Sequence, residues 1–221
     1  MDRKRTAILI SGRGSNMTAL IDAARDQNYP AQICLVVSNR PDAAGLQRAA
    51  EAGIATAVVD HRAYGKDREA FERALQDVLL QHRIEIVCLA GFMRLLTAWL
   101  VGQWPNRMLN IHPALLPAFK GLDTHRRAIE AGVTEHGATV HFVVPEMDSG
   151  PVIAQGAVPV LPDDTEATLA ARVLGIEHRI YPLALKLVAA DRVRVVGSEC
   201  VVDGPIGPQD ASMLPGHVTA H

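Results

Sequence analysis

The chain has 221 residues, 48% of them hydrophobic and 21% charged, and a formal net charge of −2 at pH 7. This composition is typical of a globular protein with a sizeable core and argues against a disordered chain. The slightly negative charge removes the main electrostatic reason to expect nucleic-acid binding. No stretch approaches the about 20 apolar residues of a membrane span, and the apolar run after the N-terminus stops at Ser11, too early for a signal peptide. We therefore expect a cytoplasmic protein with no membrane partner.

Strand-like and helix-like stretches alternate in the first half of the chain. Apolar runs predict the strands, and apolar residues at helical spacing predict the helices. In chain order, we expect strands at 6–10, 32–38, 55–59 and 84–89, and helices at 16–27, 42–52 and 66–82. Gly53 follows the second helix, where a glycine readily adopts the left-handed conformation that ends it. Strands that alternate with helices predict an α/β protein with a parallel, doubly wound, Rossmann-like sheet.

The pattern changes in the second half. A short strand at 107–111 ends at His112, and a helix is expected near 124–132. Two strand-like runs, 137–144 and 152–160, are separated by about seven residues, too few for a crossover helix, so we expect them to pair antiparallel. The sheet should therefore be mixed, mostly parallel with an antiparallel C-terminal part.

A long helix with one apolar stripe is expected from about Thr165 to Ala190. From Asp203 onward, Pro and Gly are frequent and periodicity is weak, which predicts a poorly ordered tail. We find neither repeats nor a linker. The expected organisation is therefore a single domain over 1–202, with halves 1–100 and 101–202, followed by a tail at 203–221.

Neither the cysteines nor two of the histidines predict a metal site. The chain has three cysteines, Cys34, Cys88 and Cys200, and no two of them are close in sequence. Each lies in a strand-like run, so we interpret them as small buried side chains. His136 and His141 flank a strand-like run but fall on opposite faces, and neither has a carboxylate at ligand spacing. We expect no metal and no disulfide.

The first candidate for chemistry is the loop Ser11-Gly12-Arg13-Gly14-Ser15-Asn16, between a strand and a helix. Free backbone N–H groups and the helix dipole favour an anion there. The loop lacks the Lys of a Walker motif, and Met17 stands where a dinucleotide fingerprint needs its third Gly. A plain turn with a Ser or Asn helix cap is the alternative. Because ligands bind at the carboxyl ends of strands in α/β sheets, we interpret the loop as a phosphate site.

The second candidate is Asn110-Ile111-His112-Pro113. Alternation along a strand directs Asn110 and His112 to the same face. An amide and an imidazole at one point suit a reaction that forms an oxyanion and moves a proton. For a single histidine, local hydrogen bonding at the strand end is the more common role.

Two carboxylates bear on this site. Asp148 lies in the turn before Gly150 and, if it reaches His112, would fix the tautomer of the ring and stabilise its charged form; by itself it is an ordinary turn residue. Glu177 falls at the edge of the apolar stripe of the long helix, where a carboxylate needs a partner, although a plain surface Glu is the alternative. His178 falls opposite the stripe and is expected to be solvated.

Several longer motifs occur in order over about residues 6–190, and together they resemble phosphoribosylglycinamide formyltransferase. They are Ser11-Gly12-x-Gly14-Ser15-Asn16, Leu89-Ala90-Gly91-Phe92-Met93-Arg94, Asn110-Ile111-His112-Pro113-x-Leu115-Leu116-Pro117, Gly121-Leu122-x-Thr124-His125, His136-Gly137-x-Thr139-Val140-His141, Asp148-x-Gly150-Pro151-Val152-Ile153 and Glu177-His178-x-Ile180-Tyr181-Pro182. Ala114 replaces the Ser that is usual in that family after the His-Pro pair.

The resemblance implies the formyltransferase fold and the transfer of a formyl group from 10-formyltetrahydrofolate to glycinamide ribonucleotide in purine biosynthesis. The folate is then a cosubstrate that the reaction consumes, and the enzyme needs no fixed cofactor and no metal. Its partners are small molecules, and the protein itself is expected to be a monomer or a homodimer. The implied catalytic residues are Asn110, His112 and Asp148, with His112 as proton donor. The implied nucleotide-binding residues are Gly14, Ser15, Asn16, Met17 and Glu177. The implied folate-binding residues are Arg68, Met93, Arg94, Leu95, Leu96, Asn110, Val144, Pro145, Glu146, Met147 and Asp148. The resemblance also implies a cis bond at Leu116-Pro117.

Other functions fit the sequence less well. Methionyl-tRNA formyltransferase carries a further C-terminal domain for tRNA, and formyltetrahydrofolate hydrolase normally carries an extra N-terminal domain; we expect neither here, since residues 1–5 leave no room for the second. A dinucleotide-dependent oxidoreductase would need an acidic residue where Asn39-Arg40-Pro41 stands. A nucleotide sensor without activity would not need to retain all three catalytic residues.

Overall fold

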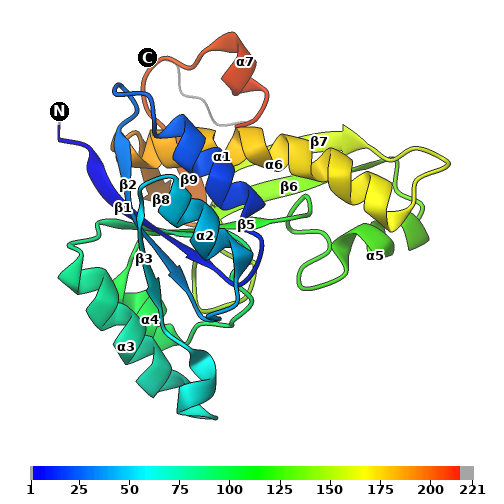
Figure 1. Cartoon of the computed structure of the whole chain (residues 1–221). Helices are drawn as coiled ribbons and strands as arrows, with labels where there is room; N and C mark the ends of the chain where they lie inside the picture. The colour runs from blue at the N-terminus through cyan, green and yellow to red at the C-terminus, as the bar shows by residue number, and fades with distance from the viewer. Residues whose placement is uncertain (1, 215–221) are drawn as a thin grey trace. The chain divides into compact units, whose positions relative to one another are not determined.

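The structure, a computed structural model, describes residues 2–214 and divides into two compact units, Met1–Asn110 and Ile111–His221 (Figure 1). In the first unit, parallel strands occur in the order β3-β2-β1-β4-β5. Their bounds are β1 (Lys4–Ile10), β2 (Ala31–Ser38), β3 (Ala55–Val58), β4 (Ile86–Leu89) and β5 (Met108–His112). Leu89 lies beside both Leu9 and Asn110 in the register, so Asn110 falls at the carboxyl ends of the parallel strands.

Helices cover both faces of these strands, α1 and α2 on one side and α3 and α4 on the other (Figure 1). Their bounds are α1 (Ser15–Ala23), α2 (Ala44–Glu51), the 3₁₀ helix η1 (His61–Tyr64), α3 (Arg68–Gln81) and α4 (Ala98–Gln103). Because both faces are covered, every residue of β4 is buried. Gly53 has a φ of 75° just after α2, which confirms its expected place at the helix end.

Helix α1 ends at Ala23, earlier than the predicted Gln27. Asp26 accepts a hydrogen bond from the backbone N–H of Asn28 at 2.9 Å, a local turn that competes with continuation of the helix. Helices η1 and α4 are absent from the sequence-based expectation, because four and six residues are too short to show a helical period.

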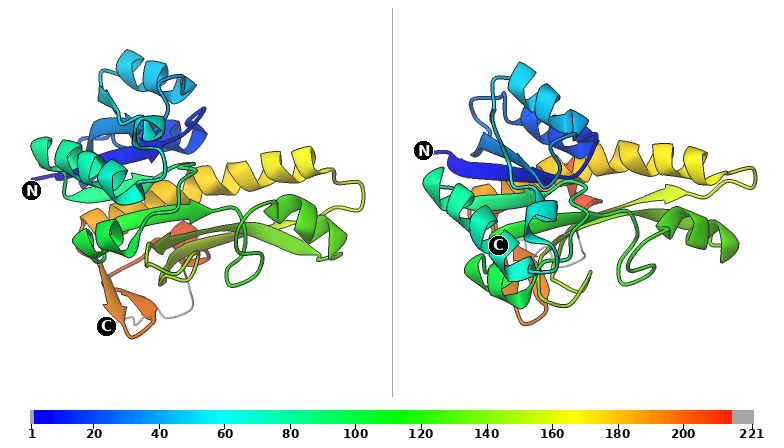
Figure 2. Two further views of the ribbon diagram at one scale, coloured as in Figure 1. Left: turned by 90° about the horizontal axis from the view of Figure 1, so that it is seen from below. Right: turned by 60° about the horizontal axis from the view of Figure 1, so that its bottom comes forward.

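The second unit pairs β6 (Glu135–Phe142) antiparallel with β7 (Val152–Pro159), so the predicted pairing is confirmed. Helix α6 (Glu166–Ala189) packs along both strands (Figure 2), and α5 (Thr124–Glu130) contacts α6. A Cβ on Gly156 of β7 would lie 2.3 Å from Ile176 of α6, so only glycine permits this close approach. Thr165 and Thr168 form a capping box that starts α6.

The chain continues into an antiparallel hairpin, β8 (Val193–Val196) and β9 (Glu199–Val202), and the short helix α7 (Pro208–Ala211). For residues 203–214 the expectation of a poorly ordered tail is wrong. The backbone N–H of Gln155 donates to the carbonyl of Met213 at 2.8 Å, and both Met213 and Leu214 are buried. A few apolar side chains are enough to hold this Pro- and Gly-rich segment against the rest of the unit, although they are not spaced at a helix or strand period. The rest of the predicted tail, 215–221, lies outside the described residues.

The main sheet has seven strands in the order β3-β2-β1-β4-β5-β6-β7, mostly parallel with an antiparallel end. The predicted fold class is therefore confirmed. No helix formed by residues 2–214 has the length and apolar character needed to cross a membrane.

Candidate active site

The loop between β1 and α1 leads into a helix whose first residues have no side-chain cap. Gly14 is the N-cap of α1 with a left-handed φ of 73°, and no side chain caps the helix. The alternative of a Ser or Asn cap is therefore not observed. The carbonyl of Gly12 accepts a hydrogen bond from the backbone N–H of Gly45 at 3.0 Å, which anchors the loop to α2. Uncapped N–H groups at a helix start suit an anion.

The predicted nucleotide residues of this loop differ in exposure. Ser15 is half-buried, Asn16 is 9% exposed, and the side chain of Met17 is fully buried in the core. The side chain of Met17 is therefore closed to a ligand, whereas Ser15 keeps part of its surface accessible.

The loop after β4 holds the first group of predicted folate residues, and hydrogen bonds anchor it at three points. The backbone N–H of Met93 donates to the hydroxyl of Ser11 at 2.8 Å. From α3, the guanidinium of Arg68 donates to the carbonyl of Leu95. The carboxylate of Glu72, 1% exposed, accepts from the backbone N–H of Thr97 at 2.7 Å and from its hydroxyl.

These anchors leave apolar side chains on the surface of the loop. Met93 is 67% exposed and Leu95 is 63% exposed, while Leu96 is half-buried. An anchored backbone with exposed apolar side chains can receive a flat ring.

Strand β5 ends with the proposed chemical groups, Asn110 and His112. His112 is 5% exposed. Its Nε2 lies 2.9 Å from the carbonyl oxygen of Phe119, and its Nδ1 lies 3.5 Å from Oδ2 of Asp148. The structure thus brings His112 and Asp148 together. Both ring nitrogens therefore face oxygen atoms, one of a backbone carbonyl and one of a carboxylate.

Asp148 is held in place by its own turn. Its φ is 50°, in the left-handed region that Asp adopts more readily than most residues, and its Oδ2 accepts from the backbone N–H of Gly121 at 2.9 Å. A Cβ on Gly150 would lie 1.7 Å from the carbonyl oxygen of Phe142, so the turn requires glycine there. The carboxylate therefore has little freedom to leave the imidazole.

His141 is a member of this cluster that the sequence analysis missed. Its Nε2 lies 3.8 Å from Oδ1 of Asp148, and its Nδ1 lies 2.9 Å from the carbonyl oxygen of Phe142. The expectation that it has no carboxylate partner is wrong, because the register of β6 and β7 shifts at Val140/His141 and the partner comes from the following turn. Burial lowers the pKa of His141, and the neighbouring Asp148 offsets part of that effect.

The half-buried His125 and the buried His136 form a second pair of histidines, and His136 also contacts the ring of Phe119. Their ring centroids are 5.3 Å apart in an edge-to-face arrangement, and His136 is 1% exposed. Burial, and to a lesser degree His125, lowers the pKa of His136 to about 4. Within residues 2–214 no group of three or more His, Cys, Asp or Glu side chains could hold a metal ion. The described cysteines are free.

The remaining predicted residues of the second unit lie on α6 and in the turn before Asp148. Glu177 is 8% exposed, so it is not an ordinary surface Glu. His178 is half-buried and burial lowers its pKa, so the expectation that it is solvated is wrong. The turn residues range from half-buried to exposed; they are Val144, Pro145, Glu146 and Met147.

The loop after His112 is fixed by Thr139. Its hydroxyl donates to the carbonyl of Ala114 at 2.6 Å and accepts from the backbone N–H of Leu116 at 3.1 Å. The Leu116-Pro117 bond is cis, as expected. Ala114 is fully buried, and its place in the loop is set through its backbone.

Comparison with known proteins identifies relatives of this chain. The pattern of the family described as formyl transferase matches residues 4–185. The chain is 45% identical to phosphoribosylglycinamide formyltransferase of Escherichia coli, over 89% of the chain and 92% of that protein. It is 52% identical to the human trifunctional purine biosynthetic protein adenosine-3, over 87% of the chain but only 19% of that protein, so it spans about a fifth of that relative's length. The crystal structure of glycinamide ribonucleotide transformylase 1 from Symbiobacterium toebii superposes with a TM-score of 0.87 at 45% identity, covering 90% of this chain and 93% of that one.

Proposed function

The chain belongs to the formyl transferase family, and on that premise we propose that it transfers the formyl group of 10-formyltetrahydrofolate to the amine of glycinamide ribonucleotide. The products are formylglycinamide ribonucleotide and tetrahydrofolate, in purine biosynthesis. The observation that carries this proposal is the buried His112 facing Asp148 at 3.5 Å, in a chain whose full-length relatives bear the name of this activity.

The nucleotide is held at both ends. The backbone N–H groups at the start of α1, from Gly14 to Met17, bind its phosphate, and the Ser15 hydroxyl and Asn16 add polar contacts. Glu177 binds the glycinamide portion and orients its amine. The amine must be neutral to attack, and a carboxylate that accepts a hydrogen bond from it leaves its lone pair available.

The folate is a consumed cosubstrate. Its ring contacts the loop residues Met93, Arg94, Leu95 and Leu96 and the turn from Val144 to Asp148, and Arg68 contributes its positive charge. Attached to this ring, the formyl group is presented to Asn110 and His112.

The amine attacks the formyl carbon, and the carbonyl oxygen becomes an oxyanion. Asn110 and His112 donate hydrogen bonds to that oxygen as its charge develops, which is when such donors lower the barrier most. The bond from the formyl carbon to N10 of the folate then breaks, and the proton lost by the amine reaches N10 by way of His112, which gives its own proton to N10 and regains one from the amine. Asp148 keeps the imidazolium oriented for this step. His141, on the other oxygen of Asp148, limits the rotation of that carboxylate.

Small molecules are the partners of this reaction. We expect no nucleic-acid or membrane partner, a cytoplasmic location and a monomer or homodimer. The reaction requires neither a metal nor a fixed cofactor.

One assay tests the proposal. Purified protein is mixed with glycinamide ribonucleotide and a 10-formyl folate, and deformylation is followed by absorbance. Turnover that requires the nucleotide supports the proposal. Deformylation without the nucleotide would identify a hydrolase, and tight nucleotide binding without turnover would identify a sensor.

A further inference from the structure

Thr139 of β6 is the centre of a hydrogen-bond network in the second unit. Its hydroxyl donates to the carbonyl of Ala114 at 2.6 Å and accepts from the backbone N–H of Leu116 at 3.1 Å. The side-chain amide of Gln155 donates to the same hydroxyl at 2.8 Å and to the carbonyl of Leu116 at 3.0 Å. One donated and two accepted hydrogen bonds use the full capacity of a hydroxyl. The loop after His112 is therefore held by two side chains that complete each other.

Gln155 lies on β7, the edge strand of the main sheet, directly opposite Thr139 on β6. The next residue, Gly156, faces α6, so alternation places the Gln155 side chain on the other face of the strand, toward the loop. The backbone N–H of Gln155 donates to the carbonyl of Met213 at 2.8 Å. An edge strand ordinarily leaves such N–H groups without a partner in the sheet. The end of the described chain is thus joined to β7 at the residue whose side chain holds the loop.

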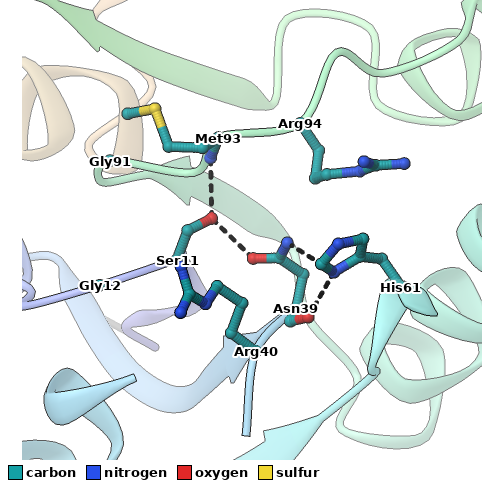
Figure 3. Close-up of a pocket in the computed structure, with 8 residues that line it drawn as sticks. All are labelled: Ser11, Gly12, Asn39, Arg40, His61, Gly91, Met93 and Arg94. Carbon is teal, nitrogen blue, oxygen red and sulfur yellow. Dashed lines mark hydrogen bonds between the residues drawn. The ribbon is translucent and has the colours of Figure 1, made fainter. Parts of the chain in front are cut away.

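The two units hold their loops with similar networks that end in different parts of the chain. In the first unit, the Ser11 hydroxyl holds the backbone of Met93, and both residues lie within 4–185, the range that matches the family pattern (Figure 3). In the second unit, the network extends beyond that range to Met213. Met213 and Leu214 are 6% and 8% exposed, so apolar burial keeps this end of the network in place.

We infer that the C-terminal segment 203–214 is a strap that sets the position of the loop after His112, with Gln155 as the positioning residue between them. The inference rests on the proposed function, because its main consequence is a change in the rate of formyl transfer. The strap holds β7 at Gln155, and the Gln155 amide holds Leu116. The same loop carries the carbonyl of Phe119, whose oxygen lies 2.9 Å from Nε2 of His112. A displacement of about 1 Å near a reactive group can cost about 100-fold in rate, so a loosened loop lowers kcat.

Gln155→Met tests the positioning residue, because it removes both amide donors and keeps the length of the side chain. We expect kcat to fall about tenfold, since two hydrogen bonds to the loop are lost. Both KM values should change little, because the loop from Ala114 to Phe119 holds none of the residues assigned to substrate binding. Ala157→Ser, at an exposed position of the same strand, is the control and should leave kcat unchanged. A wild-type kcat in Gln155→Met would overturn the inference.

Met213→Asp tests the strap in the full chain, because a charged side chain is not stable at this buried position. We expect kcat to fall about fivefold with both KM values unchanged, the size of one lost hydrogen bond. Met213→Leu keeps an apolar side chain of similar volume and should restore the wild-type kcat. Ser212→Asp, at the exposed neighbouring position, introduces the same charge and should have no effect. If Met213→Asp does not fold, the milder Met213→Ala takes its place.

The double variant Gln155→Met/Met213→Asp shows whether the strap acts through Gln155. If it does, the double variant should have about the kcat of Gln155→Met alone. Independent effects would instead multiply, to a loss of about 50-fold, and this result would refute the link between the two residues. A merely destabilised protein would not produce this pattern, and urea denaturation of each variant measures its stability separately.

Hydrogen exchange measures the same link without activity. The backbone N–H of Leu116, which donates to Thr139, should exchange faster in Met213→Asp than in the wild type, and at the wild-type rate in Met213→Leu. If the wild type transfers no formyl group, the proposed function fails, and faster exchange at Leu116 still supports the strap. Faster exchange at the N–H of Gln155 without any change at Leu116 would show that the segment docks on β7 but does not hold the loop, and would refute the inference.

Discussion

The two units of the molecule carry polar groups of opposite character. In the first unit, several groups assigned to binding lie in loops after strands and keep accessible surface: Met93, Leu95 and Arg94, which makes no ion pair or hydrogen bond within residues 2–214. In the second unit, the buried His112 and His141 converge on a single carboxylate, Asp148. Binding groups must meet a ligand that arrives from water, whereas proton transfer benefits from groups whose orientation is fixed away from it.

The units also differ in how their positions are fixed. The first unit holds exposed loops in place with buried anchors, such as Glu72 on Thr97 and Ser11 on Met93. The second unit holds the reactive carboxylate itself, through its own turn and the N–H of Gly121. A substitution in the first unit should therefore change mainly substrate affinity, and one at Asp148 should change mainly the rate.

The largest effect is expected from Asp148→Asn. The amide has nearly the shape of the carboxylate but no charge to orient an imidazolium, so kcat should fall about 10²- to 10⁴-fold, the usual contribution of general acid–base catalysis. KM for both substrates should change little. Asp163→Asn, at an exposed position of the same unit, is the control for initial-rate kinetics. A near-normal kcat would show that Asp148 has no part in the mechanism. It would also contradict the view that the second unit supplies the groups that set the rate.

Glu177→Gln should chiefly raise the KM for the nucleotide. Losing a hydrogen bond to a charged group costs about 1.5–3 kcal/mol, which corresponds to about a 10- to 100-fold change. This would show that one residue of the second unit acts in binding. Glu166→Gln, exposed on the same helix, should leave the kinetics unchanged. An unaltered KM for the nucleotide in Glu177→Gln contradicts the assigned role.

Ser15→Ala should raise the KM for the nucleotide about fivefold and leave kcat near the wild-type value, since one contact to the phosphate is lost but the backbone N–H groups remain. Thr18→Ala serves as the control, since it removes a hydroxyl from the same helix whose hydrogen bond, within residues 2–214, goes to the carbonyl of Gly14. If Ser15→Ala lowered kcat instead, the first unit would have a part in the chemical step.

The last prediction concerns stability and tests a buried histidine. The folded-state pKa of His136 is about 4, below the reference value of about 6.5 for an unfolded chain. Between these values the unfolded state binds more protons, so the stabilisation is complete above about pH 6.5 and is lost as pH falls toward 4, on the order of 3 kcal/mol.

Chemical denaturation between pH 7 and pH 4 measures this slope. His136→Leu should have a flatter dependence of unfolding free energy on pH than the wild type. His82→Gln, at a half-buried position of the first unit, is the control. Equal slopes for the wild type and His136→Leu would show that His136 is not buried as a neutral ring.

Much of the fold could be predicted because its signals are local. The apolar runs of β1, β2 and β4, the spacing in α3 and α6 and the glycine after α2 each depend on a few neighbouring residues. The antiparallel pair β6 and β7 followed from the short connection alone. The helices η1 and α4 are too short to show a helical period, so no local pattern predicts them. The docking of Met213 and Leu214 depends on residues that lie far away in the sequence.

Covalent spacing and backbone geometry directly set the alternation of strands and helices, the glycine-rich loop before α1 and the placing of Asn110 and His112 on one strand, so these could be read from the chain. Packing alone makes Asp148 face His112, lets His141 share the same carboxylate and leaves Arg94 without an ion pair or hydrogen bond among the described residues. These are contacts between segments that the chain brings together by packing, and no local pattern specifies the few ångströms in which their chemistry lies.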